Sequence, residues 1–247
     1  MRALTRRSYD VYLPPGYSRA AAGGARFGAL YLLHGSPGWP RLFVDAGNVG
    51  VAMDTLVARG RIRPFLIVLP DGRDGSFKSD TEWADSAHGR YESHVLDVVR
   101  AVDRRRPTLS DRDHRALAGN SVGAYAAVNL ALRHLDVFGT VESWSGYFTQ
   151  TRAGPFKHAG QALLAANSPA LSVAARAPAL ARLPLHAFLY GGTRDPVTRQ
   201  LGTFAARLRA AGADVIARVY EGGHDWRLWR AKTPLMLRYA ATRIAAP

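Results

Sequence analysis

Residues 115–125 read Arg115-Ala-Leu-Ala-Gly119-Asn-Ser121-Val-Gly123-Ala-Tyr125. A short apolar run ends in a glycine, and Ser121 lies two residues from Gly119 and two residues from Gly123. This order predicts a nucleophile elbow, the sharp turn from a strand into a helix that lifts a serine hydroxyl above a sheet. Glycines suit the flanking positions because side chains there would collide with the neighbouring strand and helix.

Strand patterns and helix patterns alternate along the rest of the chain. Apolar or alternating runs predict strands at residues 8–13, 29–33, 64–69, 138–143, 185–190 and 214–220, and amphipathic spacing predicts helices at 49–58, 91–102, 122–132, 197–210 and the C-terminal end. Loops are predicted at residues 18–26 and 71–88, and a cap-like excursion at residues 147–182. This alternation is typical of the α/β class, with a mainly parallel central sheet covered by helices on both faces. No boundary divides the pattern, so we expect a single domain over residues 1–247.

Three predicted strands are followed by residues that suit nucleophilic catalysis, namely Ser121, Asp195 and His224. In an open α/β sheet, ligands bind beyond the carboxyl ends of the strands. A serine needs a base to attack at neutral pH, histidine has an unperturbed pKa of about 6.5, and a carboxylate orients the histidine. The order Ser–Asp–His is expected when an elbow lies in the middle of such a sheet. The sequence therefore predicts a catalytic triad of these three residues.

Competing interpretations exist for two members of this triad. His34 is another histidine at a strand end, and we expect it to shape the loop that follows it. Asp195 precedes Pro196, and an aspartate in that position also suits the cap of a helix. Glu221 and Asp214 are the alternative carboxylates.

The negative oxygen that forms during attack on a carbonyl needs two amide donors. The amide of Val122 begins the helix after Ser121, where the helix dipole adds positive charge. His34-Gly35-Ser36 resembles the His-Gly-x turn that supplies the second donor in this architecture. Pro37 has no N–H, so the Ser36 amide is the second candidate for the oxyanion hole.

The totals of charged residues and cysteines limit the partners. The chain carries 33 Lys and Arg against 19 Asp and Glu, a net charge of +14. Such an excess indicates either a solvated basic surface or attraction to an anionic membrane surface, cell-wall polymer or substrate. Nucleic acid is not an expected partner, because the basic residues are scattered and accompany no binding motif. The absence of cysteine excludes disulfides, thiol catalysis and cysteine-bound zinc.

The sequence does not fix the compartment. No apolar run is long enough for a membrane span, and no secretory signal is evident. We expect either a cytoplasmic protein or a domain excised from a longer secreted or membrane-linked protein. The oligomeric state stays open.

Five motifs occur in an order that resembles a known family: Tyr12-Leu-Pro-Pro-Gly-Tyr17, Tyr31-Leu-Leu-His-Gly35, Gly119-Asn-Ser-Val-Gly123, Ser143-Trp-Ser-Gly146 and Gly223-His-Asp-Trp-Arg-Leu-Trp229. Together they resemble the esterase-D-like branch of the α/β-hydrolases, which includes S-formylglutathione hydrolases, feruloyl esterases and mycolyltransferases. The resemblance implies ester hydrolysis or acyl transfer through an acyl-enzyme, with no metal and no cofactor. The chain departs from the family at Ala124, where many relatives have a second glycine, and in lacking the cysteines of the glutathione-linked members.

We therefore expect a serine ester hydrolase of the carboxylesterase type, acting on a small-molecule or lipid ester. The alternatives are an acyltransferase with the same triad, and the catalytic domain of a membrane-linked enzyme acting on anionic lipid or cell-envelope esters. A non-catalytic binding module is the alternative from another class. Candidate substrate-binding residues are Trp39, Glu82, Trp83 and Trp226.

Overall fold

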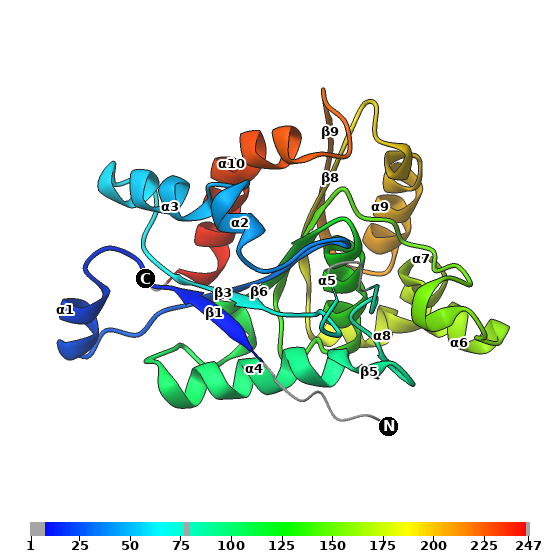
Figure 1. Cartoon of the computed structure of the whole chain (residues 1–247), viewed down its shortest axis with the longest axis horizontal. Helices are drawn as coiled ribbons and strands as arrows, with labels where there is room; N and C mark the ends of the chain where they lie inside the picture. The colour runs from blue at the N-terminus through cyan, green and yellow to red at the C-terminus, as the bar shows by residue number, and fades with distance from the viewer. Residues whose placement is uncertain (1–7, 77–79, 246–247) are drawn as a thin grey trace.

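The computed structural model of the chain describes residues 8–76 and 80–245, and its centre is a seven-stranded sheet (Figure 1). The strands of this sheet are β1 (Tyr9–Tyr12), β2 (Ala29–Leu33), β3 (Leu66–Pro70), β6 (Arg115–Asn120), β7 (Thr140–Trp144), β8 (His186–Gly192) and β9 (Asp214–Tyr220). A separate small hairpin pairs β4 (Asp85–Ser86) with β5 (Gly89–Arg90). The helices are α1 (Tyr17–Ala22), α2 (Leu42–Asp45), α3 (Val49–Ala58), α4 (Tyr91–Arg105), α5 (Val122–Arg133), α6 (Gln161–Ala166), α7 (Pro169–Ser172), α8 (Ala177–Arg182), α9 (Leu201–Ala210) and α10 (Trp226–Ile244). Short 3-10 helices are η1 (Arg112–His114), η2 (Gly154–Phe156), η3 (Val173–Arg176) and η4 (Pro196–Gln200).

The strand order places a crevice in the middle of the sheet. The order is β1-β3-β2-β6-β7-β8-β9, in which β1 pairs antiparallel and the other pairs are parallel. From β2 the chain builds outward to β3 on one side and to β6 through β9 on the other. The connections that leave β2 and β6 therefore diverge, which opens a crevice at their carboxyl ends.

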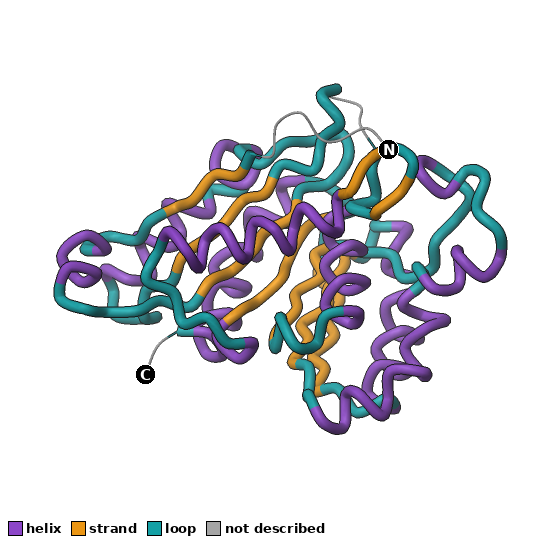
Figure 2. Tube along the Cα trace, turned by 90° about the horizontal axis from the view of Figure 1, so that it is seen from below, coloured by secondary structure: helices purple, strands orange, loops and turns teal. Residues whose placement is uncertain are grey.

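Helices cover both faces of the sheet, as the sequence predicts. The core on one face includes residues of α4, α5 and α9, and the core on the other face includes residues of α2, α3 and α10. Figure 2 shows the long helix α4 crossing the strands on its face. Helix α5 is buried at every residue from Gly123 to Leu132, because its small side chains let it approach the sheet closely. Within the described ranges, no helix is both long and apolar enough to cross a membrane.

One predicted loop is wrong in part. Residues 18–26 are predicted as a flexible loop, but helix α1 covers Tyr17–Ala22. The alanines of this segment have the highest intrinsic helix propensity. The ring of Tyr17 also packs against Phe27, with 5.1 Å between ring centroids, which anchors the helix to the core.

The segment at residues 147–182, predicted as a cap-like excursion, holds the elements from η2 to α8. It is tied to the body of the domain by the stacked rings of Phe148 and Phe204, with centroids 4.0 Å apart. The hydroxyl of Tyr125 also donates to the carbonyl of Asn167 at 2.8 Å. In Figure 1 helix α7 lies beside α9, and α6 lies next to α7. A capping function for this segment stays a prediction.

A carboxyl group is buried in the middle of the sheet. Glu142 on β7 has no solvent exposure, and the indole N–H of Trp144 donates to its Oε2 at 3.0 Å. Its Oε1 has no hydrogen-bond partner among the described residues. Burial raises the pKa of Glu142 to about 8, so the group is mostly neutral at neutral pH.

A Glu142→Gln variant is expected to be more stable than the wild type at alkaline pH. In the unfolded chain a glutamate titrates at about 4.3, whereas in the folded chain the pKa of Glu142 is about 8. The folded state binds the extra proton between these values, so the stability of the wild type falls as pH rises through this window. Each pKa unit corresponds to about 1.4 kcal/mol, so the total is on the order of a few kcal/mol.

Thermal unfolding at pH 5, 7 and 9 measures this effect, and the exposed Glu221→Gln variant is the control. The difference in Tm between Glu142→Gln and the wild type should grow with pH. Parallel curves for these two proteins would contradict the assignment of a neutral Glu142.

Candidate active site

The strand–turn–helix geometry predicted around Ser121 is confirmed. Ser121 lies between β6 and α5 with φ +55° and ψ −121°, a conformation that is strained for any residue with a side chain. Its amide donates to the carbonyl of Trp144 at 3.0 Å. A Cβ atom at Gly119 would lie 2.5 Å from the carbonyl oxygens of Gly123 and Leu33, so the turn closes only with glycine at this position.

Side chains from three separate loops meet at this turn. His224 Nε2 lies 2.8 Å from Ser121 Oγ, and His224 Nδ1 lies 3.0 Å from Asp195 Oδ2. A carboxylate can only accept, so Nδ1 carries a proton and donates to Asp195. In the neutral ring Nε2 then accepts from the Ser121 hydroxyl. A continuous chain of hydrogen bonds thus connects the three residues that the sequence predicts as a triad.

Asp195 is held as a carboxylate although its side chain is fully buried. Burial by itself raises the pKa of Asp195, but hydrogen bonds from His224 and Ser145 and from the amide of Val197 outweigh it and hold the pKa below its ordinary value. The Val197 amide donates to Oδ1 at 3.1 Å, at the start of η4. The capping role considered for this residue therefore coexists with its contact to the histidine, because the two roles use different oxygens.

The alternative carboxylates lie in other environments. Glu221 is 86 % exposed and pairs with Arg194 at 3.5 Å. Asp214, at the start of β9, accepts from His186 at 2.9 Å and from Arg243 at 3.0 Å.

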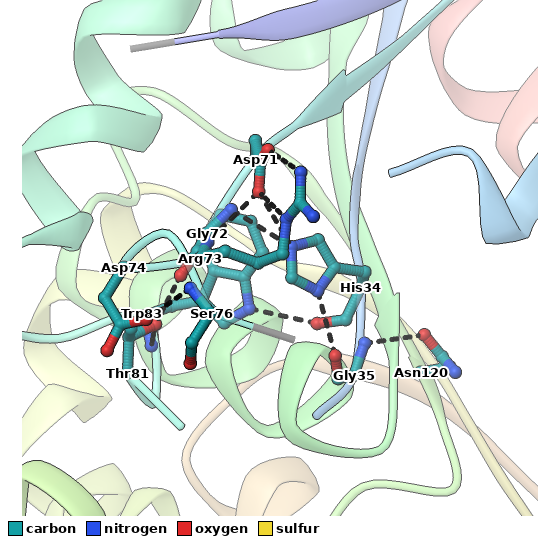
Figure 3. Close-up of polar contacts among 10 residues, drawn as sticks. All are labelled: His34, Gly35, Asp71, Gly72, Arg73, Asp74, Ser76, Thr81, Trp83 and Asn120. Atoms are coloured by element: carbon teal, nitrogen blue, oxygen red, sulfur yellow. Dashed lines mark hydrogen bonds and ion pairs between the residues drawn. The ribbon is translucent and has the colours of Figure 1, made fainter. Parts of the chain in front are cut away.

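Hydrogen bonds with Gly72 and Asn120 hold the loop after β2 in place (Figure 3). The amide of Gly72 donates to His34 Nε2 at 3.0 Å, so the ring proton is on Nδ1, which donates to the carbonyl of Gly35 at 2.9 Å. The amide of Gly35 donates to Asn120 Oδ1 at 3.1 Å. His34 therefore shapes the loop, and the residue before Ser121 ties this loop to the elbow.

Glu82 and Trp83 lie outside the cavity lining, and Trp83 packs against the same loop. The indole N–H of Trp83 donates to the carbonyl of His34 at 3.1 Å, and the indole, 2 % exposed, covers Gly72 (Figure 3). A Cβ atom at Gly72 would lie 2.6 Å from this ring. Glu82 accepts from the Tyr147 hydroxyl, and burial raises the pKa of Glu82 to about 7.

A cavity of about 220 Å³ opens at Ser121. Its lining residues are Gly35, Ser36, Pro37, Leu42, Asn120, Ser121, His224, Trp226 and Trp229. Of the four candidate substrate-binding residues, Trp226 is in this lining, whereas Trp39, Glu82 and Trp83 are not. The sequence alone does not single out Leu42 or Trp229. The available signal is the spacing of Trp226 and Trp229, which are three residues apart and hence on one face of a helix.

The described residues contain no group of three or more His, Asp or Glu side chains that could hold a metal ion. The reactive side chains that line the cavity are the hydroxyl of Ser121 and the imidazole of His224. Such a set suits nucleophilic acyl chemistry.

A mainly parallel sheet with a strained serine at its central turn, hydrogen-bonded to a histidine and a buried aspartate, defines an α/β-hydrolase. Residues 4–240 match the family model described as "Putative esterase". The chain belongs to this esterase family.

Comparisons with individual proteins agree with this family. The solved structure of a ferulic acid esterase superposes with a TM-score of 0.85 at 26% identity, covering 97% of this chain and 93% of that one. An endo-1,4-beta-xylanase/feruloyl esterase of Xylanibacter ruminicola is 33% identical over 136 residues, which is 53% of this chain and 18% of that protein. An S-formylglutathione hydrolase from Agrobacterium tumefaciens has a TM-score of 0.75 at 14% identity over 97% of this chain and 90% of that one, which shows the shared fold. The chain spans less than a third of the length of the curated relatives it matches.

Proposed function

We propose that the chain hydrolyses carboxylic esters through an acyl-enzyme formed on Ser121. The observation that carries this proposal is the hydrogen-bonded chain from Ser121 Oγ through His224 to the buried Asp195. His224 accepts the hydroxyl proton as Ser121 Oγ attacks the ester carbonyl, and then gives this proton to the leaving alcohol. Water, deprotonated by His224, releases the acid and restores the serine. Asp195 keeps the imidazole in the tautomer that this cycle needs.

Two amides are proposed to hold the oxyanion. Ser36 belongs to the loop after β2 and lines the cavity, and the next residue, Pro37, has no N–H, so the Ser36 amide is the proposed donor from this loop. Val122 is the first residue of α5, where amides point away from the helix and carry its positive end. Both amides belong to segments that the surrounding contacts hold rigidly, which is what oxyanion stabilisation requires.

An aromatic acyl group is the proposed occupant of the cavity. Pro37, Leu42, Trp226 and Trp229 are the apolar part of its lining, and two of these four residues are aromatic. The ring of Trp226 packs edge to face against those of Phe43 and Trp229, with centroid distances of 5.5 Å to Phe43 and 5.2 Å to Trp229. The names of the ferulic acid esterase and of the xylanase/feruloyl esterase support hydroxycinnamoyl esters as the substrates to test first. Substrate contacts of Trp39, Glu82 and Trp83 stay predictions.

The purified chain is expected to release free acid from p-nitrophenyl acetate, p-nitrophenyl butyrate and methyl ferulate in water. Trp226→Ala should enlarge the cavity and raise the kcat/KM for bulky acyl groups relative to acetate by about tenfold. The exposed Val51→Ala variant is the control for a general loss of stability. An unchanged preference in Trp226→Ala would remove Trp226 from the acyl pocket, and no acid release from any ester would contradict the function.

Acyl transfer to an alcohol uses the same residues, and product analysis separates it from hydrolysis. A transferase would release little acid until an alcohol acceptor is added. An anionic membrane surface as a partner of the +14 chain also stays a prediction.

A further inference from the structure

The side chain of Asn120, the last residue of β6, is held by the loop after β2. Asn120 is 3 % exposed and lines the cavity at Ser121. The amide of Gly35 donates to Asn120 Oδ1 at 3.1 Å in a buried contact (Figure 3). A backbone N–H can only donate, so the side-chain oxygen of Asn120 must face Gly35, and its NH2 group must face the other way.

The NH2 group of Asn120 has no acceptor within the part of the chain that the structure describes. Among residues 8–76 and 80–245, the bond from Gly35 is the only hydrogen bond of the Asn120 side chain. The nitrogen is not sealed in the core either, unlike the unpartnered side-chain oxygens of Tyr31 and Glu142. Because Asn120 lines the cavity, its two N–H bonds are available to a ligand that occupies this cavity.

This NH2 group lies close to the nucleophile. A Cβ atom at Gly35 would be 3.1 Å from Ser121 Cβ and 3.6 Å from Asn120 Nδ2, so both groups lie against the same side of this glycine. Asn120 also directly precedes Ser121, and consecutive Cα atoms are about 3.8 Å apart. The reacting carbonyl, which bonds to Ser121 Oγ, is therefore the part of an ester nearest to the Asn120 amide.

The geometry points to Asn120 as a further catalytic residue: its NH2 group donates a hydrogen bond to the carbonyl oxygen of the ester as this oxygen becomes negative. Asn120 acts beside the proposed amide donors of Ser36 and Val122. The inference rests on the proposed function, because it adds a side-chain donor to the oxyanion hole of that reaction.

The contact with Gly35 prepares this donor for catalysis. It fixes the Asn120 side chain before a substrate binds, so little reorganisation is needed when negative charge develops. Donation from Gly35 to Oδ1 also polarises the Asn120 amide, which strengthens its N–H groups as donors. The other two reactive side chains in the lining, Ser121 and His224, are hydrogen-bonded to each other at 2.8 Å.

Asn120→Asp separates hydrogen-bond donation from support of the loop. A carboxylate at this position still accepts from Gly35, so the loop stays attached, but it presents a negative acceptor in place of the NH2 group. The kcat for p-nitrophenyl butyrate should fall by about a hundredfold or more, with KM changed by less than about threefold. The matched control is Asn48→Asp, at an exposed position before α3, which should keep the wild-type kcat.

Asn120→Leu removes the donor without adding a charge, and its kcat should also fall by about a hundredfold. A trifluoromethyl ketone provides a measurement that a purely structural role would not move in step. Its adduct with Ser121 carries a negative oxygen like that of the transition state. The inhibition constant should therefore rise in Asn120→Leu by the factor by which kcat/KM falls. If the leucine variant folds poorly, Asn120→Ala gives the same comparison.

A folded Asn120→Asp variant with the wild-type kcat would overturn the inference, because support of the loop would then be the only role of Asn120. An effect on KM alone would overturn it too, and so would a loss confined to some esters, since all esters share the carbonyl oxygen. Failure of the proposed function is distinguishable, because the wild type itself would then neither turn over esters nor react with a fluorophosphonate.

Discussion

Ser121→Ala is expected to lower ester hydrolysis by about 10⁴- to 10⁶-fold while the protein stays folded. The loss is large because the variant has no atom that can form the acyl-enzyme, and the remaining rate comes from the oxyanion donors and substrate binding alone. Alanine and serine adopt the φ of +55° at similar cost, so the free energy of unfolding should change little.

A fluorophosphonate probe provides the second measurement. The wild type should be labelled at Ser121, as determined by peptide mapping, and Ser121→Ala should not be labelled. Ser143→Ala, a buried serine on the adjacent strand, should be labelled like the wild type. Undiminished hydrolysis by a pure Ser121→Ala preparation would refute the assignment of the nucleophile.

Gly123→Ala is expected to give the largest loss of stability. The added Cβ would lie 2.0 Å from the carbonyl oxygen of Leu33 and 2.7 Å from that of His34. These are backbone atoms at the end of β2, so the clash cannot be relieved by a side-chain rotation. Either α5 or the loop after β2 must move, at a cost of about 3 kcal/mol or more.

Urea unfolding measures this loss in the free energy of unfolding, and Gly202→Ala is the matched control. Gly202 is on the outer surface of α9, where a Cβ would meet no atom within 4 Å, so alanine should be neutral or stabilise by up to about 1 kcal/mol. Activity should fall together with stability in Gly123→Ala, because the loop that carries Ser36 is displaced. A fully stable Gly123→Ala would mean that the elbow does not press against β2.

The central elements could be predicted because their signals are local. Helix α3 has the predicted bounds, 49–58, since its apolar spacing is contained within one segment. Ser121, Asp195 and His224 each follow a recognisable strand, and parallel strands bring their carboxyl ends to one edge of a sheet. Their meeting is therefore a consequence of topology that the sequence pattern already contains.

The less predictable features depend on long-range packing. Trp83 is placed by the path of the loop after β3, which folds back over the carboxyl ends of the strands. There the indole N–H of Trp83 donates to the carbonyl of His34. No periodic pattern marks such a contact. The hydrogen bond from Trp229 to Ser145 joins residues 84 positions apart, and spacing along α10 gives only the face of the helix. Helix α1 is hard to predict for a different reason: Gly16 before it and Gly23 after it are typical of turns, and they enclose only six residues, too few to show a helical pattern.

Trp229 has two structural roles, and a single substitution would change both of them. It forms part of the cavity wall, and it also bonds to Ser145 and packs against His224. Pro37, Leu42 and Trp226 also line the cavity, but no hydrogen bond or ring contact joins them to Ser121, Asp195 or His224 among the described residues, so we expect these positions to vary more freely as substrates change. A substitution at Trp229 would alter acyl preference and turnover together. We expect members of this family that share the site to keep the tryptophan while the other apolar lining residues vary.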